Sequence, residues 1–288
     1  MLKLALKADY NPGVLTTIRG KSVLITGAGR GIGKRLAMGF AAEGARVGLL
    51  ARSQSELDLA KLEIEQAGGQ ALRLRADVRN LEELAHAVER MRSSFGSLDV
   101  LIAAAGVQGP VGPFLSTKPK AWNETVETNL IGVANACRVA LPPMIDKRSG
   151  KIILIAGGGS AYARPNFTAY GVAKTAVVRF GETLALEVSD HNVQVNTIAP
   201  GAAYSTMTDE ILRAGEEKAG RKEIEDAEKV RVTGGIPAEK QVALALFLAS
   251  ERSNHISGKL IHVNDDWKRF EQDNMKPELY TLRRVQKI

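Results

Sequence analysis

Apolar residues follow two alternating patterns along this chain: short continuous runs, and longer segments in which they recur every three or four positions. The runs are typical of buried strands, and the longer segments are typical of amphipathic helices. Strands are predicted at residues 21–26, 45–51, 70–75, 98–106, 151–157, 193–200 and 259–263. Helices are predicted at residues 32–43, 54–67, 80–95, 120–140, 168–189 and 238–250. The alternation predicts the α/β class, with a doubly wound parallel sheet covered by helices on both faces.

The chain has 288 residues, an ordinary length for one α/β domain, and no break in composition marks a second domain. We expect an N-terminal extension at residues 1–20, the domain at residues 21–264 and a C-terminal tail at residues 265–288. The tail is polar and basic, which leaves two alternatives open: packing on a neighbouring subunit, or mobility.

Charge and composition exclude several classes of function. The net charge is +7, but acidic residues are interleaved with the basic ones, as in residues 216–231, so no clustered basic face for nucleic acid is expected. The small excess of positive charge fits a surface of mixed charge, and it fits an anionic cofactor or substrate equally well. No apolar run approaches the length of about 18 residues that a membrane span needs. Metal-ligand spacing is absent from the four histidines, which are His86, His191, His255 and His262.

The single cysteine, Cys137, rules out an internal disulfide and suits a reducing cytoplasm. Its place in an apolar helix predicts a small core residue rather than a nucleophile. The start of the chain, residues 1–13, is too short and too interrupted for a signal peptide. A cytoplasmic location is therefore expected.

A glycine-rich turn, TGAGRGIG at residues 26–33, joins the first predicted strand to the first predicted helix. Gly27, Gly31 and Gly33 allow the backbone to turn tightly and to approach a pyrophosphate without a side-chain clash. Amide groups at the start of the helix, near Ile32, offer donors and a partial positive charge to an anion. With a strand before it and a helix after it, the turn indicates a dinucleotide site.

The residues after the second predicted strand bear on the choice of dinucleotide. A carboxylate there would accept a hydrogen bond from the ribose 2′-hydroxyl of NAD and would repel a 2′-phosphate. The chain instead has Ala51, Arg52 and Ser53, and the Arg52 guanidinium can bind a phosphate through two nitrogens. Arg30, inside the glycine turn, offers a second positive charge. NADP is favoured over NAD; the alternative is that Arg52 is a solvated loop residue.

Tyr170 and Lys174 lie four residues apart in a predicted helix, so their side chains share one face. A phenol has a pKa of about 10, too high for ready proton exchange at neutral pH. A nearby ammonium stabilises the phenolate and thereby lowers that pKa. The pair indicates a proton donor and acceptor beside the cofactor, and the lysine can also hold ribose hydroxyls.

The spacing T-G-x-x-x-G-x-G of the turn, followed by Y-x-x-x-K after the fifth strand, resembles that of the tyrosine-dependent short-chain dehydrogenases/reductases. The resemblance covers about residues 20–263. It implies a Rossmann fold that transfers a hydride between NADP(H) and a carbonyl or secondary alcohol of a small molecule. It also implies that Tyr170 is the general acid/base, that Lys174 lowers its pKa, and that Asn129 kinks its helix and supports the proton relay through a water.

Further cofactor contacts follow from the same resemblance. Asp77 corresponds to an aspartate that binds the adenine amino group with help from the backbone of the next residue, here Val78. The alternative for Asp77 is a role in the turn before the next helix. Asn80 and Glu83 already offer a capping pattern for that helix, which leaves Asp77 free for adenine.

The resemblance also covers the nicotinamide end of the cofactor. Residues 103–106 are AAAG where the family has Asn-Asn-Ala-Gly, so side-chain bonds that steady the sheet are lost while Ala104 keeps a small surface against the cofactor. Pro200 and Gly201 match the turn beside the nicotinamide. Ser205 falls where a threonine commonly meets the carboxamide.

One family residue is missing: Gly157 stands where a serine is expected, about thirteen residues before the tyrosine. That hydroxyl orients the substrate carbonyl, and loss of one such donor typically costs about a hundredfold or more in rate. Three replacements stay open, namely the hydroxyl of Ser160, the hydroxyl of Tyr162, and an oxyanion nest of the backbone amides of Gly157, Gly158 and Gly159. Ser160 is equally well an ordinary loop residue.

The resemblance predicts a substrate lid at residues 202–236, and a homodimer or homotetramer that uses the apolar helix at residues 238–250. The predicted function is an NADP-dependent oxidoreductase of small-molecule carbonyls and alcohols. The alternative is a dinucleotide-binding regulatory or scaffold protein with little turnover, because the usual serine is replaced by Gly157.

Overall fold

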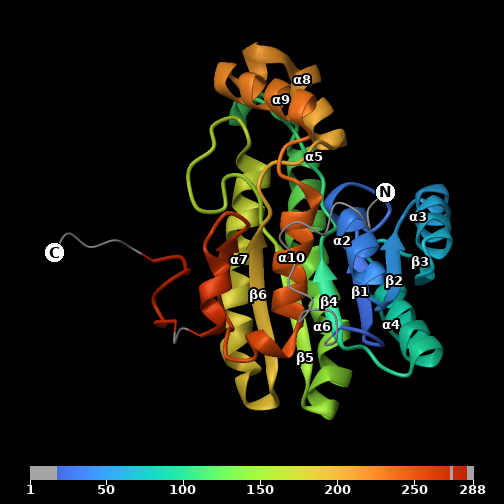
Figure 1. The fold of residues 1–288 in the computed structure, drawn as a ribbon. Coiled ribbons are helices and arrows are strands. Elements are labelled where there is room, and N and C mark those ends of the chain that lie inside the picture. Colours follow the sequence, from blue (N-terminus) through green and yellow to red (C-terminus); the bar gives the residue numbers. More distant parts are fainter. Residues whose placement is uncertain (1–17, 273–274, 284–288) are drawn as a thin grey trace.

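The structure is a computed structural model that describes residues 18–272 and 275–283 (Figure 1). Most of the predicted extension, residues 1–17, lies outside the described residues. The core of the domain includes Ile18, which is fully buried. Gly20 then donates a backbone hydrogen bond to the carbonyl of Gly44, which ties the entering chain to the domain.

Seven strands form one parallel sheet in the order β3-β2-β1-β4-β5-β6-β7. They are β1 (Ser22–Thr26), β2 (Arg46–Ala51), β3 (Gln70–Arg75), β4 (Val100–Ala103), β5 (Gly150–Ile155), β6 (Val193–Ala199) and β7 (Leu260–His262). The four central strands are buried almost throughout, as expected for a parallel sheet covered on both faces. The predicted α/β doubly wound fold is confirmed.

The helices are α2 (Gly31–Ala42), α3 (Gln54–Gln66), α4 (Leu81–Phe95), α5 (Pro119–Val126), α6 (Gly132–Lys147), α7 (Thr168–Glu187), α8 (Thr206–Ala219), α9 (Arg221–Thr233) and α10 (Ala238–Ala249). Two apolar cores lie on opposite faces of the sheet. One core joins the sheet to α2, α3 and α10, and the other joins it to α4, α6 and α7. Cys137 is buried in the second core, and burial raises the pKa of its thiol to about 12.

The predicted helix at 120–140 differs from the observed one in both its continuity and its end. A π-helical turn, Glu127–Ile131, separates α5 from α6. The helix then continues through Pro142 and Pro143 to Lys147. Met144, one residue beyond the prolines, is fully buried in the core. The predicted end at residue 140 is therefore too early, because tertiary packing outweighs the helix-breaking tendency of the two prolines.

The strand order reverses between β1 and β4, so the carboxyl ends of these two strands diverge and leave a crevice. Figure 1 shows α8 and α9 standing beyond that edge of the sheet, over the carboxyl ends. The two helices belong to the segment 202–236, which we call the lid. At its base, Tyr204 donates a backbone hydrogen bond to Gly234, and Ile236 donates one to Ala202.

Two other predicted segments pack within this chain. The described part of the tail lies against β7 and α7, because Leu260 donates to the carbonyl of Tyr280 and Arg179 donates to that of Leu282. The apolar residues of α10 are buried in the first core beside α2. Their apolar character is therefore explained without a subunit contact.

Candidate active site

A cavity of about 1170 Å³ opens at the carboxyl edge of the sheet, between the strand ends and the lid. Its wall contains every residue predicted to bind the cofactor except Asn129, which lies behind it. These wall residues are Gly27, Arg30, Gly31, Ile32, Gly33, Arg52, Asp77, Val78, Ala104, Tyr170, Lys174, Pro200, Gly201 and Ser205. The structure thus brings together positions spread over almost two hundred residues of sequence.

The glycine turn forms one end of the cavity. Gly33 lies so close to the turn that a Cβ there would be 2.2 Å from the carbonyl oxygen of Gly27, so only glycine fits. Helix α2 begins directly after the turn, with Arg30 as its N-cap residue, no side-chain cap and no acidic residue in its first turn. Its first amide groups are therefore available to an anion, as a phosphate site at a helix N-terminus requires.

Two exposed arginines, Arg30 and Arg52, line the cavity. The Arg52 guanidinium is more than half exposed and lies 3.8 Å from a carboxylate oxygen of Asp77. Arg30, similarly exposed, donates to Glu56 at 3.3 Å. Glu56 also covers the turn, since its Oε2 lies 2.9 Å from where a Cβ on Gly29 would be. Exposed pairs of this kind contribute little stability, so both guanidiniums can exchange their carboxylate partners for a phosphate.

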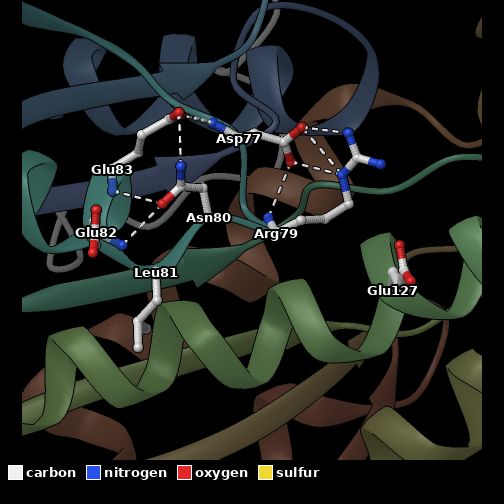
Figure 2. A pocket seen from close by; sticks show the side chains of 7 residues that line it. All are labelled: Asp77, Arg79, Asn80, Leu81, Glu82, Glu83 and Glu127. Carbon is white, nitrogen blue, oxygen red and sulfur yellow. Dashed lines mark hydrogen bonds and ion pairs between the residues drawn. The ribbon is translucent and has the colours of Figure 1, made fainter.

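The turn after β3 is held by hydrogen bonds among its own side chains (Figure 2). The Asp77 carboxylate accepts from both the side chain and the backbone of Arg79, and the hydrogen bond from the guanidinium lowers its pKa. Asn80 caps α4 by accepting from the backbone amides of Glu82 and Glu83. Glu83 reaches back to the backbone amide of Asp77 at 2.7 Å. The side chains of Asp77, Asn80 and Glu83 in Figure 2 are thus hydrogen-bonded to their neighbours, and Asp77 already serves the turn while it lines the cavity.

The Pro200–Gly201 turn leads from β6 into the lid and lines another part of the cavity wall. Gly201 has a φ of +67°, and the carbonyl of Pro200 accepts from the buried Gln241 side chain of α10 at 2.9 Å. Ser205 begins α8 and faces the glycine turn, 3.8 Å from where a Cβ on Gly31 would be. The glycine turn and the start of the lid are therefore direct neighbours.

Tyr170 and Lys174 project from the first two turns of α7. The start of this helix is fixed by α5, because the indole of Trp122 donates to Thr168 at 3.1 Å. Lys174 Nζ donates to the carbonyl of Ile155, at the end of β5, at 2.8 Å and lies 5.9 Å from the Tyr170 ring centroid. Both side chains are over 90% buried. The predicted pair is thus anchored to the sheet at the cavity wall.

Burial acts on both groups in the protein without cofactor. It raises the pKa of Tyr170 above its usual value, an effect that the nearby Arg164 guanidinium opposes. It lowers the pKa of Lys174 to about 8. At neutral pH the phenol is therefore protonated and the ammonium still carries its charge.

Asn129 lies in the π-helical turn between α5 and α6 and is fully buried. Its Oδ1 accepts from the backbone amide of Val107 at 2.8 Å, and its Nδ2 donates to the carbonyl of the same residue at 2.9 Å. A Cβ on Gly106 would lie 3.2 Å from Asn129 Oδ1 and 3.7 Å from Lys174 Nζ. Gly106 therefore leaves the space in which these two groups approach each other.

The position of the missing serine is filled by the tyrosine itself. A Cβ on Gly157 would lie 2.3 Å from the Tyr170 hydroxyl, far inside van der Waals contact. Ser160 is buried in the cavity wall, and its amide donates to the carbonyl of Gly157 at 3.1 Å, which closes a tight turn. Tyr162 is 66% exposed. Gly158 also lines the cavity.

Lid and catalytic helix are joined by a short apolar cluster and one ion pair. Phe167, just before α7, packs with Ile211 and Ala227 of the lid. Arg164 donates to the Glu223 carboxylate of α9 from Nε at 2.9 Å and from Nη2 at 2.6 Å. This fork is among the more buried ion pairs of the described chain, with Arg164 only 12% exposed.

Several residues of the site were not predicted from the sequence: Glu56, Gly106, Arg164, Glu223 and Gln241. Arg164 carried a usable signal, since it is the only charged residue between Lys151 and Lys174. Gly106 stood in the motif at residues 103–106 but was given no role. Glu223 lies in the predicted lid, although no residue of α9 was singled out there, and Glu56 and Gln241 come from helices that the sequence analysis did not place beside the site.

Replacement of Lys174 by methionine tests its burial through the pH dependence of stability. With a folded pKa of about 8 against an ordinary 10.5, the folded protein releases this proton before the unfolded chain does. Between these values the unfolded state binds more protons, so wild-type stability rises with pH. We therefore compare the free energies of unfolding of the two proteins. Between pH 7 and pH 10, the value for the wild type should rise by about 2–3 kcal/mol relative to that of Lys174→Met.

Urea unfolding midpoints of the two proteins at both pH values measure this difference. Lys151, whose pKa burial lowers to about 7, is present in both proteins and cancels. A stability difference that does not change with pH would contradict the expected burial of a charged Lys174.

In the described residues, 18–272 and 275–283, no helix is long and apolar enough to cross a membrane. Within the same ranges, no three His, Cys, Asp or Glu side chains gather into a group that could hold a metal ion.

Comparison with known proteins identifies the class. The family model described as short chain dehydrogenase matches residues 21–216. The chain is 32% identical over 245 residues to the 3-oxoacyl-(acyl-carrier-protein) reductase FabG of Staphylococcus aureus, covering 85% of this chain and 96% of that one. The protein therefore belongs to the short-chain dehydrogenase family and is an NAD(P)-dependent oxidoreductase acting on CH–OH groups.

Two solved structures illustrate the range of the family. The chain is 26% identical to a gluconate 5-dehydrogenase from Burkholderia cenocepacia in complex with NADP and tartrate, with a TM-score of 0.76, covering 86% of this chain and 96% of that one. It is 25% identical to carveol dehydrogenase from Mycobacterium avium in complex with NAD, with a TM-score of 0.77, covering 86% of this chain and 97% of that one. Relatives of this fold thus bind either dinucleotide.

Proposed function

We propose that the protein transfers a hydride between NADP(H) and a carbonyl or secondary-alcohol group of a small molecule. The observation that carries the proposal is the placement of Tyr170 and Lys174 on one wall of a cavity that continues to the glycine turn. Tyr170 holds the proton that a reduced carbonyl oxygen takes up, and Lys174 supplies the charge that stabilises the phenolate. Asn129 supports this arrangement from behind the wall.

The cofactor would lie along the predicted wall residues. The α2 amides would hold the pyrophosphate, Asp77 and Val78 would face the adenine, and Ser205 would meet the carboxamide beside Pro200 and Gly201. A nicotinamide dinucleotide supplies the hydride when bound. The chain's own contribution is to orient the ring and to hold the transferable proton on the Tyr170 hydroxyl.

The test of this function is oxidation of NADPH by the purified protein in the presence of a panel of ketones and aldehydes. Turnover with at least one carbonyl supports the proposal. Tight NADPH binding with no turnover on any probe, and no change in cellular phenotype on Tyr170→Phe, would favour a regulatory or scaffold role.

Preference for NADP is supported by the two exposed guanidiniums and by Ala51 in place of a carboxylate. A hydrogen bond to a charged group is worth about 1.5–3 kcal/mol, so we expect Arg52→Ala to weaken NADPH binding about tenfold or more. NADH binding should change less than about twofold, because that cofactor has no 2′-phosphate. Fluorescence titration of both cofactors measures this.

Arg73→Ala is the matched control, since Arg73 is an exposed arginine that pairs with Asp58 away from the cavity. An equal loss of NADPH and NADH affinity in Arg52→Ala would contradict the 2′-phosphate contact. Glu56→Gln should act in the opposite direction and raise NADPH affinity about two- to fivefold, because it removes a negative charge beside Arg30.

Assembly and location complete the proposal. Homodimers or homotetramers are expected from the family resemblance, and light scattering after size-exclusion chromatography tests them. A cytoplasmic location agrees with the single, buried thiol of Cys137.

A further inference from the structure

The reacting oxygen of a substrate needs a second donor besides Tyr170, and Gly157 supplies no hydroxyl. The wall beside Tyr170 offers few groups that could serve. Ser160 is buried there, and Tyr162 is largely exposed. The remaining polar side chain on this segment is Arg164, which lines the same cavity.

The Arg164 guanidinium is fixed in position on three sides. Nε and Nη2 donate to the two oxygens of Glu223, and the guanidinium carbon lies 3.8 Å above the Phe167 ring. It lies 5.9 Å from the centroid of the Tyr170 ring. Such a fork leaves little freedom, so the direction of the third nitrogen is set by the fold.

That third nitrogen, Nη1, makes no hydrogen bond to any residue in the described ranges. It lies beside Gly158, 3.4 Å from where a Cβ on that residue would be, and the Tyr162 hydroxyl lies at the same distance from that point. Nη1 is thus placed next to Gly157, whose missing side chain leaves room for the Tyr170 hydroxyl. Nη1 keeps two N–H donors for a ligand in the cavity.

Charge balance indicates what kind of oxygen Nη1 would bind. Glu223 already neutralises the guanidinium, so the pair as a whole carries no net charge. The lid adds two further carboxylates to the cavity wall, Glu210 and Asp226, against one lysine, Lys229. An anionic group placed against the lid would therefore meet repulsion, whereas an uncharged carbonyl or hydroxyl oxygen beside Tyr170 and the charged Lys174 would be accepted.

We propose that Arg164 is the substrate-orienting residue that replaces the absent serine, donating from Nη1 to the uncharged oxygen that reacts beside Tyr170. This inference rests on the oxidoreductase function proposed above and adds that the substrate is electrically neutral around its reacting carbon. Glu223 is a positioning residue, since it holds the guanidinium in place from the lid. The opposing effect of Arg164 on the pKa of Tyr170 agrees with their proximity.

The first experiment measures NADPH-dependent reduction of methyl acetoacetate and of acetoacetate, which differ in charge but share the ketone. We expect the wild type to favour the ester. Arg164→Ala should lower kcat/KM for the ester about a hundredfold while the Kd for NADPH stays within about twofold, as loss of one donor to the reacting oxygen predicts. Added guanidinium at a non-denaturing concentration should restore part of the rate.

A matched control and a second variant separate this role from a structural one. Arg221→Ala removes an exposed arginine that pairs with Glu225 in the same helix α9, and should leave the rate unchanged. The double variant Arg164→Met/Glu223→Met removes both buried charges, so it folds without an unpaired Glu223 and should still lack the activity. In Arg164→Ala, alcohol oxidation should need a higher pH, because Tyr170 loses the charge that lowers its pKa.

Retention of the ester rate within threefold in both Arg164 variants, with loss in Ser160→Ala or Tyr162→Phe, would overturn the inference. Calorimetric binding of methyl acetoacetate to the protein–NADP⁺ complex gives a readout besides turnover. Binding that Arg164→Ala abolishes would support the inference even if the wild type showed no turnover, in which case the proposed function alone would fail. Equal binding by both proteins, or none by the wild type, would overturn it.

Discussion

Tyr170→Phe should reduce kcat for carbonyl reduction by about a thousandfold while NADPH affinity and thermal stability stay close to wild type. The change removes the proton donor but keeps the aromatic ring in its buried place at the cavity wall. General acid–base catalysis by one positioned group is typically worth about 10²–10⁴ in rate, which sets this expectation. Single-turnover oxidation of bound NADPH measures the step directly.

The pH dependence of the two reaction directions provides a second readout. Because burial raises the pKa of Tyr170, the phenol that reduction needs persists well above neutral pH. Oxidation of an alcohol needs the phenolate, so its rate should rise with pH where reduction does not. Tyr280→Phe is the matched control, a tyrosine whose ring meets that of Phe270 in an edge-to-face contact outside the cavity. A Tyr170→Phe enzyme with wild-type kcat would rule out the proposed acid/base.

Gly157→Ser, which restores the residue usual in the family, should lower activity at least about a hundredfold instead of raising it. The new Cβ would lie 2.3 Å from the Tyr170 hydroxyl, so the phenol must move by about 1 Å or more. Displacement of a reacting group by about 1 Å can cost a factor of 10². Steady-state kinetics and a crystal structure of the variant together measure the loss and the movement.

Gly171→Ala serves as control, because it adds a Cβ directly beside Tyr170 in α7, and that Cβ would lie 3.9 Å from the carbonyl oxygen of Gly159, an ordinary van der Waals contact. Alanine in place of a helical glycine is otherwise mildly stabilising. A Gly157→Ser enzyme faster than the wild type would show that the chain has merely lost a hydroxyl, with no compensating shift of the tyrosine.

The features that the sequence predicted well are those encoded locally. The strands and the glycine turn at residues 26–33 are encoded by residues that are adjacent in sequence. The shared face of Tyr170 and Lys174 follows from the period of the helix. Parallel strands then carry such residues to one edge of the sheet, so the cavity wall follows from the topology.

What escaped prediction depends on distances between side chains far apart in the chain. Arg164 and Glu223 are 59 residues apart and meet only because the lid folds over α7. The 2.3 Å approach of the Tyr170 hydroxyl to Gly157 is likewise a product of packing, and no periodicity reveals it. The continuation of α6 through Pro142 and Pro143 was missed for the same reason, because it depends on the burial of Met144 in the core.

The base of the lid carries a wider consequence. Ala203 and Gly235 form an isolated antiparallel bridge, and Arg35 of α2 donates to the carbonyl of Ile236 just beyond it. The two ends of the lid therefore meet at one point between the end of β6 and the start of α10, so its length and composition can vary without disturbing the strands. The segment between these two residues is thus joined to the domain at a single place, as an exchangeable cassette would be. A segment from a relative joined there would bring its own substrate contacts, and it would also have to supply the roles proposed for Ser205 and Glu223.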